Sequence, residues 1–247
     1  MDGLLYVLSE PGTVPLAEFH NWYDRDHAPA RLTVPGIRGG DRYRATDGVV
    51  PTWLAVYPLT LAALDTVQYL ALRRRSARER RIVDRLAVLD RRVYAQVSTV
   101  AMSAAPAPYL LTVVQRSTDL PALAAWYREE HAPLLAEVPG WRRTSWYRSS
   151  RELLAVHELD GPAVFSSPAY RLAVTTPRRD AVRRTVTARE RRLFIHHRTV
   201  GSGPNGLASP EPGQNSQDAA VIIGARGQSQ LHEDVLDVLL DRRLGNP

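Results

Sequence analysis

The stretch WYDRDHAP at residues 22–29 returns as WYREEHAP at residues 126–133. In each copy a Val-Pro-Gly triplet follows at the same spacing, at residues 34–36 and 138–140. The offset between the copies is 131 − 27 = 104 residues, and 11 of the 23 positions from Trp22/Trp126 to Arg44/Arg148 are identical without a gap. Matching of this density in one register indicates a duplicated unit of about a hundred residues.

The composition narrows the possible chemistry. The 247 residues suffice for one or two domains with a sizeable core. Cysteine is absent, which excludes disulfides and thiolate nucleophiles, and all 32 residues of the Lys+Arg count are arginine, which excludes a Schiff-base lysine. Neither a signal peptide nor a run of about 18 apolar residues is present. We therefore expect a cytoplasmic protein with no membrane partner.

The formal net charge of +6 raises the question of a nucleic-acid partner. Residues 73–92 hold nine arginines against three acidic residues, and residues 178–192 hold seven against two. Ile82, Leu86, Leu89 and Val93 recur at helical spacing through the first cluster, so its arginines fit the solvated face of an amphipathic helix. No aromatic residue interleaves either cluster to stack on bases. We predict no nucleic-acid partner.

Hydrophobic periodicity predicts the order β-α-β-β-α-β in each copy. In the first copy we expect strands at residues 4–8, 37–45, 53–59 and 93–100, and helices at 15–27 and 61–90. Pro29 is expected to stop the first helix, and a capping box from Ser76 to Glu79 to restart the second. In the second copy we expect strands at residues 109–114, 141–148, 153–159 and 193–200, and helices at 120–131 and 166–192, the last broken near Pro177.

A β-α-β-β-α-β unit leaves one face of its sheet uncovered, and two units in one chain can cover each other. We therefore predict units at residues 1–104 and 105–200 packed sheet to sheet, as a monomer or weak homodimer. Residues 201–217 are rich in Gly, Pro, Ser and Asn and read as a flexible linker. Residues 218–247 read as a strand/helix appendage that is too short to build a core alone.

The repeated pattern Trp-Tyr-x-x-(Asp/Glu)-His-x-Pro-x-x-x-x-Val-Pro-Gly-x-x-x-x-x-x-Tyr-Arg resembles the EthD-like branch of the dimeric α/β-barrel superfamily, over residues 4–200. The resemblance implies an α+β fold in which two tandem ferredoxin-like units form an intramolecular pseudo-dimeric barrel. It also implies a pocket between the sheet and the helices of each unit. Aromatic polyketide cyclases, decarboxylases of polyketide intermediates, cofactor-free monooxygenases, lactone isomerases and haem-binding enzymes belong to that superfamily.

His27 and His131 are the first candidates for proton transfer, because the imidazole pKa lies near neutral pH. Tyr23 and Tyr127 lie one helical turn earlier, so each tyrosine can meet its histidine on the surface that faces the sheet. The acidic residue just before each histidine points elsewhere on the helix. The alternative is that each histidine ends its helix and bonds to a backbone carbonyl.

The two copies differ on the surface of the first helix that faces the sheet. There the first copy has His20 and the second has Ala124. Burying a polar group without a partner costs about 1–3 kcal/mol. Burial of His20 is therefore destabilising unless another group or the substrate binds it. We therefore favour the first pocket, with His27 as proton acceptor or donor and with Tyr23 and His20 orienting it or the substrate.

Further residues are candidates for substrate binding. Strand alternation turns either Tyr43 or its neighbours Arg42 and Arg44 toward the pocket, and the sequence leaves open which. An arginine there could hold a substrate carboxylate, and a surface ion pair is the alternative. The full set of candidates is Trp22, Tyr43, Arg44, Trp126, Tyr147, His157 and His196. The two tryptophans fit core packing better. The two histidines could point into the second pocket.

No HxH, HxxxH or two-His-one-carboxylate spacing is present, so we predict no metal site. GxGxxG, P-loop and GxSxG motifs are absent as well, and no cofactor is expected. We predict a cofactor-independent enzyme of the lyase or isomerase class, which uses general acid–base catalysis to cyclise, isomerise or decarboxylate an aromatic or polyketide-like small molecule. The alternatives are a cofactor-free monooxygenase and a non-catalytic ligand-binding or haem-binding barrel.

Overall fold

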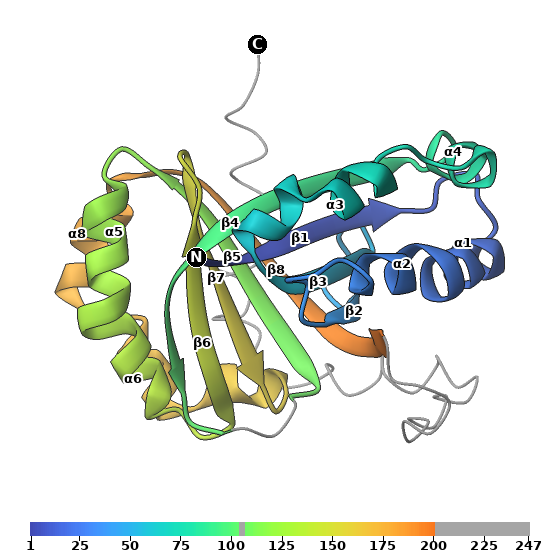
Figure 1. Cartoon of the computed structure of the whole chain (residues 1–247). Helices are drawn as coiled ribbons and strands as arrows, with labels where there is room; N and C mark the ends of the chain where they lie inside the picture. Colours follow the sequence, from blue (N-terminus) through green and yellow to red (C-terminus); the bar gives the residue numbers. More distant parts are fainter. Residues whose placement is uncertain (104–106, 201–247) are drawn as a thin grey trace, which may run out of the picture. The chain divides into compact units, whose positions relative to one another are not determined.

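The computed structural model describes residues 1–103 and 107–200, in which the order β-α-β-β-α-β occurs twice (Figure 1). The strands are β1 (Asp2–Glu10), β2 (Gly40–Ala45), β3 (Trp53–Thr60), β4 (Val88–Ala101), β5 (Tyr109–Ser117), β6 (Trp141–Arg148), β7 (Glu152–Leu159) and β8 (Val186–Val200). The helical segments of the first unit are α1 (Leu16–Trp22), η1 (Tyr23–His27), α2 (Ala28–Leu32), η2 (Leu61–Asp65), α3 (Val67–Leu72) and α4 (Ala77–Val83). Those of the second unit are α5 (Leu120–Trp126), η3 (Tyr127–His131), α6 (Ala132–Ala136), η4 (Pro162–Ser166), α7 (Pro168–Ala173) and α8 (Pro177–Arg183).

The eight strands close into one antiparallel barrel in the order β1-β3-β2-β8-β5-β7-β6-β4. Each unit contributes a four-stranded sheet, and the two sheets join edge to edge where β2 pairs with β8 and β4 pairs with β6. The helices of each unit lie outside its own sheet (Figure 1). The predicted α+β pseudo-dimeric barrel is confirmed, and its closure leaves no exposed sheet edge.

Strand alternation divides the apolar residues among three cores. On β1, Leu4, Tyr6 and Leu8 face the barrel interior, whereas Leu5 and Val7 face the helices of the first unit. The interior core takes residues from both units, and each unit has a separate core between its sheet and its helices. A pocket between helices and sheet is therefore formed mainly by one unit, although Val200 of β8 joins the first of these cores and Val100 of β4 packs against the second.

The first helix does not stop at Pro29, contrary to the prediction. It continues through a π-helical turn, η1, into α2, and the backbone N–H of Ala28 donates to the carbonyl of Tyr23, five residues earlier. A proline in a regular α-helix clashes with the carbonyl four residues before it, and the wider π turn relieves that clash. The second unit repeats the arrangement in η3, where the N–H of Ala132 donates to the carbonyl of Tyr127.

The helices predicted at residues 61–90 and 166–192 are also too long. Both regions break into short helical segments, and β4 and β8 begin at Val88 and Val186. The register explains the longer strands, because β4 pairs with β1 as far as Glu10 opposite Val88. Consequently Arg92 and Arg192 lie on strands rather than on a solvated helix face, and Arg192 is buried.

The predicted unit boundary near residue 104 stays a prediction. The linker predicted at residues 201–217 and the appendage at residues 218–247 lie outside the described residues. Within residues 1–103 and 107–200, no helix has the length and apolar character needed to cross a membrane.

Candidate functional site

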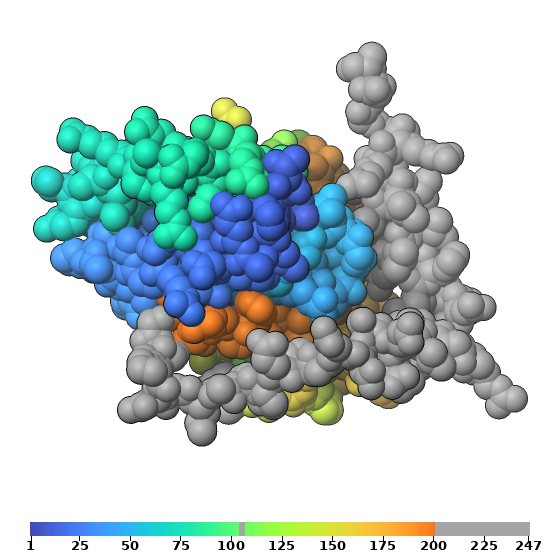
Figure 2. Space-filling view, turned by 90° about the vertical axis from the view of Figure 1, so that its right-hand side faces the viewer, coloured from blue at the N-terminus to red at the C-terminus, as the bar shows by residue number. Residues whose placement is uncertain are grey.

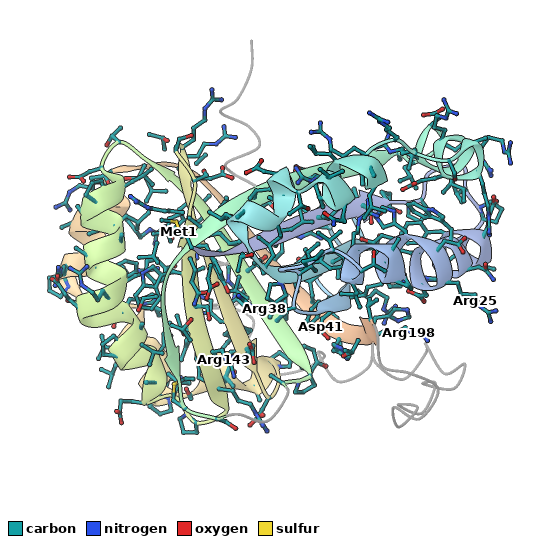
Figure 3. All side chains as sticks on the ribbon, in the orientation of Figure 1. Met1, Arg25, Arg38, Asp41, Arg143 and Arg198 are labelled. Carbon is teal, nitrogen blue, oxygen red and sulfur yellow. The ribbon has the colours of Figure 1, made fainter. Side chains whose placement is uncertain are left out.

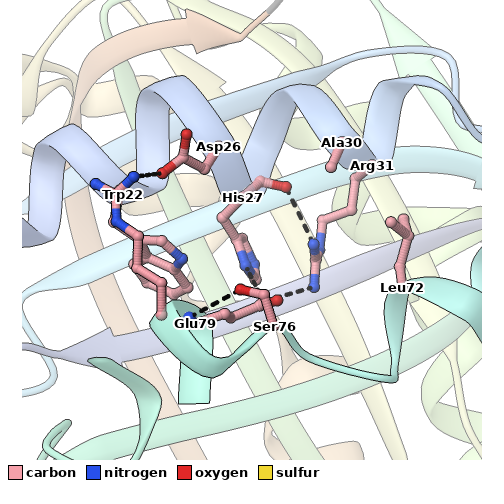
Figure 4. A pocket seen from close by; sticks show the side chains of 9 residues that line it. Trp22, Asp26, His27, Ala30, Arg31, Leu72, Ser76 and Glu79 are labelled. Atoms are coloured by element: carbon pink, nitrogen blue, oxygen red, sulfur yellow. Dashed lines mark hydrogen bonds and ion pairs between the residues drawn. The ribbon is translucent and has the colours of Figure 1, made fainter. Parts of the chain in front are cut away.

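A pocket of about 320 Å³ lies between the first helix of the first unit and its α3–α4 region (Figure 4). We call it the His27 pocket. Its lining combines apolar, acidic and basic side chains, namely Trp22, Asp26, His27, Ala30, Arg31, Leu72, Ser76, Arg78 and Glu79. The volume lies at the lower end of the range that small-molecule sites occupy.

Glu79 holds the imidazole of His27 in this pocket, with Nδ1 of the ring 2.9 Å from Oε1 of the carboxylate. The backbone N–H of Glu79 donates to Oγ of Ser76 at 3.1 Å, so Ser76 caps α4 as the sequence predicts. A capping box would turn the carboxylate back to the N-cap, whereas here it reaches His27. The orienting group for His27 is therefore Glu79, a residue that the sequence suggested only as part of a helix cap.

The protonation states follow from burial and from this hydrogen bond. Burial lowers the pKa of His27 to about 4, and Glu79 offsets part of that effect. The hydrogen bond from His27 holds the pKa of Glu79 below its usual value. At neutral pH Glu79 is an acceptor only, so the proton of the neutral imidazole is on Nδ1. Among the described residues Nε2 has no hydrogen-bond partner, and its lone pair is free to accept a proton.

Neighbouring groups fix the position of His27. The rings of Trp22 and Tyr23 lie 4.5 Å and 4.9 Å from the imidazole, centroid to centroid, so the expected meeting of Tyr23 with His27 is observed. Arg31 donates from Nη1 to the carbonyl of His27 at 3.0 Å. Asp26, by contrast, pairs with Arg78 at 2.8 Å and does not orient the ring.

The corresponding histidine of the second unit has a different environment. His131 is buried and has Nδ1 3.2 Å from the carbonyl oxygen of Ala173, while the ring of Trp126 stacks on it at 4.2 Å. The ring of Tyr127 lies 5.1 Å away, so this tyrosine also meets its histidine. Burial lowers the pKa of His131 to about 3. These contacts match the alternative in which the histidine bonds to a backbone carbonyl.

Charge also differs between the two units. In the first, Glu79 lies three residues after the N-cap Ser76, and in the second, Arg179 lies three residues after the N-cap Thr176. The carboxylate near His131 is Glu130, which accepts from Nε1 of Trp126 at 3.1 Å and from Oγ1 of Thr176. The second unit therefore lacks the carboxylate–imidazole pair of the first.

A second polar group, which we call the His20 cluster, consists of His20, Asp24, Arg42, Trp53 and His197. Arg42 is 1% exposed and forms an ion pair through Nη1 with Oδ1 of Asp24, while its Nη2 donates to Nδ1 of His20 at 3.2 Å. The ring of His20 lies 4.5 Å from that of Trp53 and 5.1 Å from that of His197. His20 thus contacts Arg42, Trp53 and His197 in this cluster. Its expected role in orienting His27 or the substrate stays a prediction.

Pairing of β8 with β2 brings His197 to the first unit, where the end of β8 (orange) lies against the first helix (blue) in Figure 2. Tyr43 pairs with His196 and Arg42 with Arg198, so a bulge leaves His197 without a partner on β2. Bulges re-aim side chains in this way. Sequence reasoning missed His197 because it lies in the repeat that does not contain His20.

Three substrate-binding candidates do not line a helix–sheet pocket. Tyr43 is buried in the barrel interior, and Tyr147 packs against the same interior core. Arg44 is exposed. Arg42 is the residue of this strand that faces the helices. In the second unit Trp146 takes the place of Arg42 and is buried. Trp22 and Trp126 are buried in the cores between helices and sheet, as core packing requires.

The two histidines expected in the second pocket have structural partners. His157 is buried, with Nδ1 3.1 Å from Oγ1 of Thr144, and the same oxygen accepts from Nε1 of Trp141 at 2.9 Å. His196 has Nε2 3.3 Å from Oδ1 of Asp41, at the junction of β8 with β2. The structure therefore places His196 away from the helix–sheet face of the second unit.

Comparison with known proteins supports the fold. No protein-family model matches the sequence, and a search of curated proteins finds no match. An anthrone oxidase-like protein matches with a TM-score of 0.60 at 14% identity, over 82% of this chain and 93% of that chain. A candidate chlorite dismutase matches with a TM-score of 0.51 at 13% identity, over 80% of this chain and 96% of that chain.

A candidate monooxygenase from Lactobacillus acidophilus matches with a TM-score of 0.50 at 10% identity, over 81% of this chain and 96% of that chain. At these identities the likeness concerns the fold, which is that of dimeric α/β-barrel proteins. The EthD-like branch and the duplication stay predictions.

Proposed function

We propose that this protein is an enzyme that moves protons on a small aromatic or polyketide-like molecule bound in the His27 pocket. The observation that carries the proposal is the hydrogen bond from His27 to Glu79 at a pocket of small-molecule size. A carboxylate that fixes the tautomer of an imidazole is a recurrent arrangement in general acid–base catalysis. Cyclisation, isomerisation and decarboxylation all require such proton transfers.

Each residue of the pair has a definite role in this proposal. His27, neutral with its proton on Nδ1, accepts a proton from a substrate carbon at Nε2. Glu79 stabilises the imidazolium that forms. The imidazolium then returns the proton to the product at another atom. The catalytic residue is His27, and Glu79 is a positioning residue that acts through it.

The low pKa of His27 restricts the substrate. A base whose conjugate acid has a pKa of about 4 abstracts protons efficiently only from acidic positions. Carbons that are flanked by carbonyl groups or aromatic rings meet this condition, because their carbanions are delocalised. Trp22 and Leu72 supply the apolar part of the lining that such a molecule needs.

The first unit is the better candidate for the active half. His27 has a carboxylate partner and a pocket, whereas His131 donates to a carbonyl and stacks on Trp126. A buried histidine with a carbonyl partner contributes to packing and to the satisfaction of polar groups. We assign His131 a structural role.

Cofactor-free oxygenation is the second candidate, and the likeness to an anthrone oxidase-like protein favours it. Removal of a proton from the methylene carbon of anthrone gives a carbanion. Addition of O₂ to that carbon and protonation give a hydroperoxide, which loses water to form the quinone carbonyl. The first step is the same proton abstraction by His27, so both candidates share one site.

Hydrogen–deuterium exchange tests the shared step directly. Anthrone and an aromatic 1,3-diketone are incubated with the protein in D₂O under nitrogen, and deuterium incorporation is followed by mass spectrometry. We expect catalysed exchange that His27→Ala lowers by about 10²–10⁴-fold and His131→Ala leaves unchanged. Exchange that survives His27→Ala contradicts the proposal. Oxygen uptake in air then separates oxygenation from isomerisation, and a Soret band after haem addition would favour the haem-binding alternative.

A further inference from the structure

Three side chains with metal-ligating atoms meet outside the His27 pocket. His20, Asp24 and His197 each offer one ligand atom, and these atoms lie within 4.8 Å of one another. Two imidazoles and one carboxylate are suitable donors for divalent first-row transition metals. We propose that His20, Asp24 and His197 form a binding site for such an ion.

All three ligands lie on helical segments or strands. His20 lies on α1 and Asp24 on η1, four residues apart, so both side chains lie on the same side of the first helix. His197 comes from the bulge of β8 that pairs with β2, the strand that carries Arg42. Ligands on helices and strands are held more precisely than ligands on loops, which favours a preformed site.

The surroundings of the three ligands support a site that is open on one side. Trp53 packs against both histidines, with ring centroids 4.5 Å from His20 and 5.0 Å from His197. His197 is exposed, so solvent or another small ligand can complete the coordination of an ion. Arg198, labelled in Figure 3, is 58% exposed and lies 3.7 Å from Oδ2 of Asp24, and its long side chain can turn away.

Arg42 is the buried group that opposes a cation here. Nη1 of its guanidinium donates to Oδ1 of Asp24, which leaves Oδ2 for an ion. Nη2 donates to Nδ1 of His20. An ion bound to Nε2 of His20 requires the proton on Nδ1, so the bond from Arg42 to His20 breaks while the bond to Asp24 remains. Arg42 therefore weakens metal binding, both by its charge and through the bond that binding must break.

The site rests on residues other than those of the His27 pocket, so its failure leaves the proposed function untouched. The full chain is titrated with Co²⁺, whose visible absorption reports ligation by nitrogen and oxygen, and Zn²⁺ is then added as a competitor. We expect a saturable spectrum at one equivalent that Zn²⁺ removes. His197→Ala, a change at an exposed position, is expected to lower the affinity at least about tenfold.

The neighbouring His196→Ala is the matched control, because His196 faces Asp41 and does not belong to the cluster. We expect it to bind Co²⁺ as the unchanged chain does. His20→Ala serves as the second variant and is expected to lose affinity as His197→Ala does. Absence of a saturable Co²⁺ spectrum overturns the site, as does a spectrum that both His197→Ala and His20→Ala leave intact. Equal losses in His196→Ala and His197→Ala also overturn it, because the ion would then bind elsewhere on β8.

Discussion

Replacement of Glu79 by glutamine tests the central interaction of the His27 pocket with little change of shape. The amide keeps the backbone bond to Ser76 and can still accept from Nδ1 of His27, but it carries no charge. Glu79 is 17% exposed, so solvent screens the interaction only in part. A hydrogen bond to a charged group contributes about 1.5–3 kcal/mol and a neutral one about 0.5–1.5 kcal/mol.

The difference of about 1–2 kcal/mol sets the expected size of the effect. If it is lost from the transition state, in which His27 becomes an imidazolium, the exchange rate in D₂O falls about 5- to 30-fold. The pKa of His27, followed by the NMR signals of its ring, is expected to fall below about 4 because Glu79 raises it in the unchanged chain. Urea denaturation at pH 7 is expected to show a loss of stability of about 1 kcal/mol.

Asp26→Asn is the matched control, because Asp26 lines the same pocket but pairs with the exposed Arg78. Exposed pairs contribute about 0–1 kcal/mol, so this variant should keep both its exchange rate and its stability. A double-mutant cycle with His27→Ala isolates the coupling between His27 and Glu79. The reasoning is refuted if Glu79→Gln exchanges deuterium at the full rate, or if the cycle shows no coupling.

Three further predictions concern stability and assembly. His131→Ala should lower the free energy of unfolding by about 2–4 kcal/mol in urea denaturation, because the buried ring stacks on Trp126 and its removal leaves a cavity; a loss below 1 kcal/mol would contradict its structural role. Stability should decrease as the pH falls from about 6.5 toward 4, because the folded-state pKa of His27 is depressed and the unfolded chain binds the proton first; the melting temperature of His27→Gln should decline less over that interval. Removal of residues 202–247 should leave a folded monomer in sedimentation, since both sheets close within residues 1–103 and 107–200; an obligate dimer would contradict this.

The repeat and the hydrophobic periodicity were sufficient to predict two β-α-β-β-α-β units, because strand alternation and helical spacing are local properties of the chain. Closure of the two units into a barrel was what the resemblance of the repeated pattern implied. The same local rules predicted that Tyr23 meets His27 and that Asp26 points elsewhere. They misplaced the ends of β4 and β8, because pairing with β1 and β5 extends these strands over arginine-rich sequence. Cross-strand partners outweigh local propensity at such positions.

Only the tertiary structure decided which polar residues share a site. Glu79 lies 52 residues after His27, and the turn between α3 and α4 brings them into contact. His20 and Asp24 show a helical spacing in the sequence, but their third neighbour, His197, comes from the other unit because barrel closure pairs β8 with β2. A period of 104 residues predicts equivalent positions within the repeats. This period contains no information about contacts where β2 pairs with β8. The pairing of these two strands and the bulge at His197 depend on the register of strands that lie far apart in the chain.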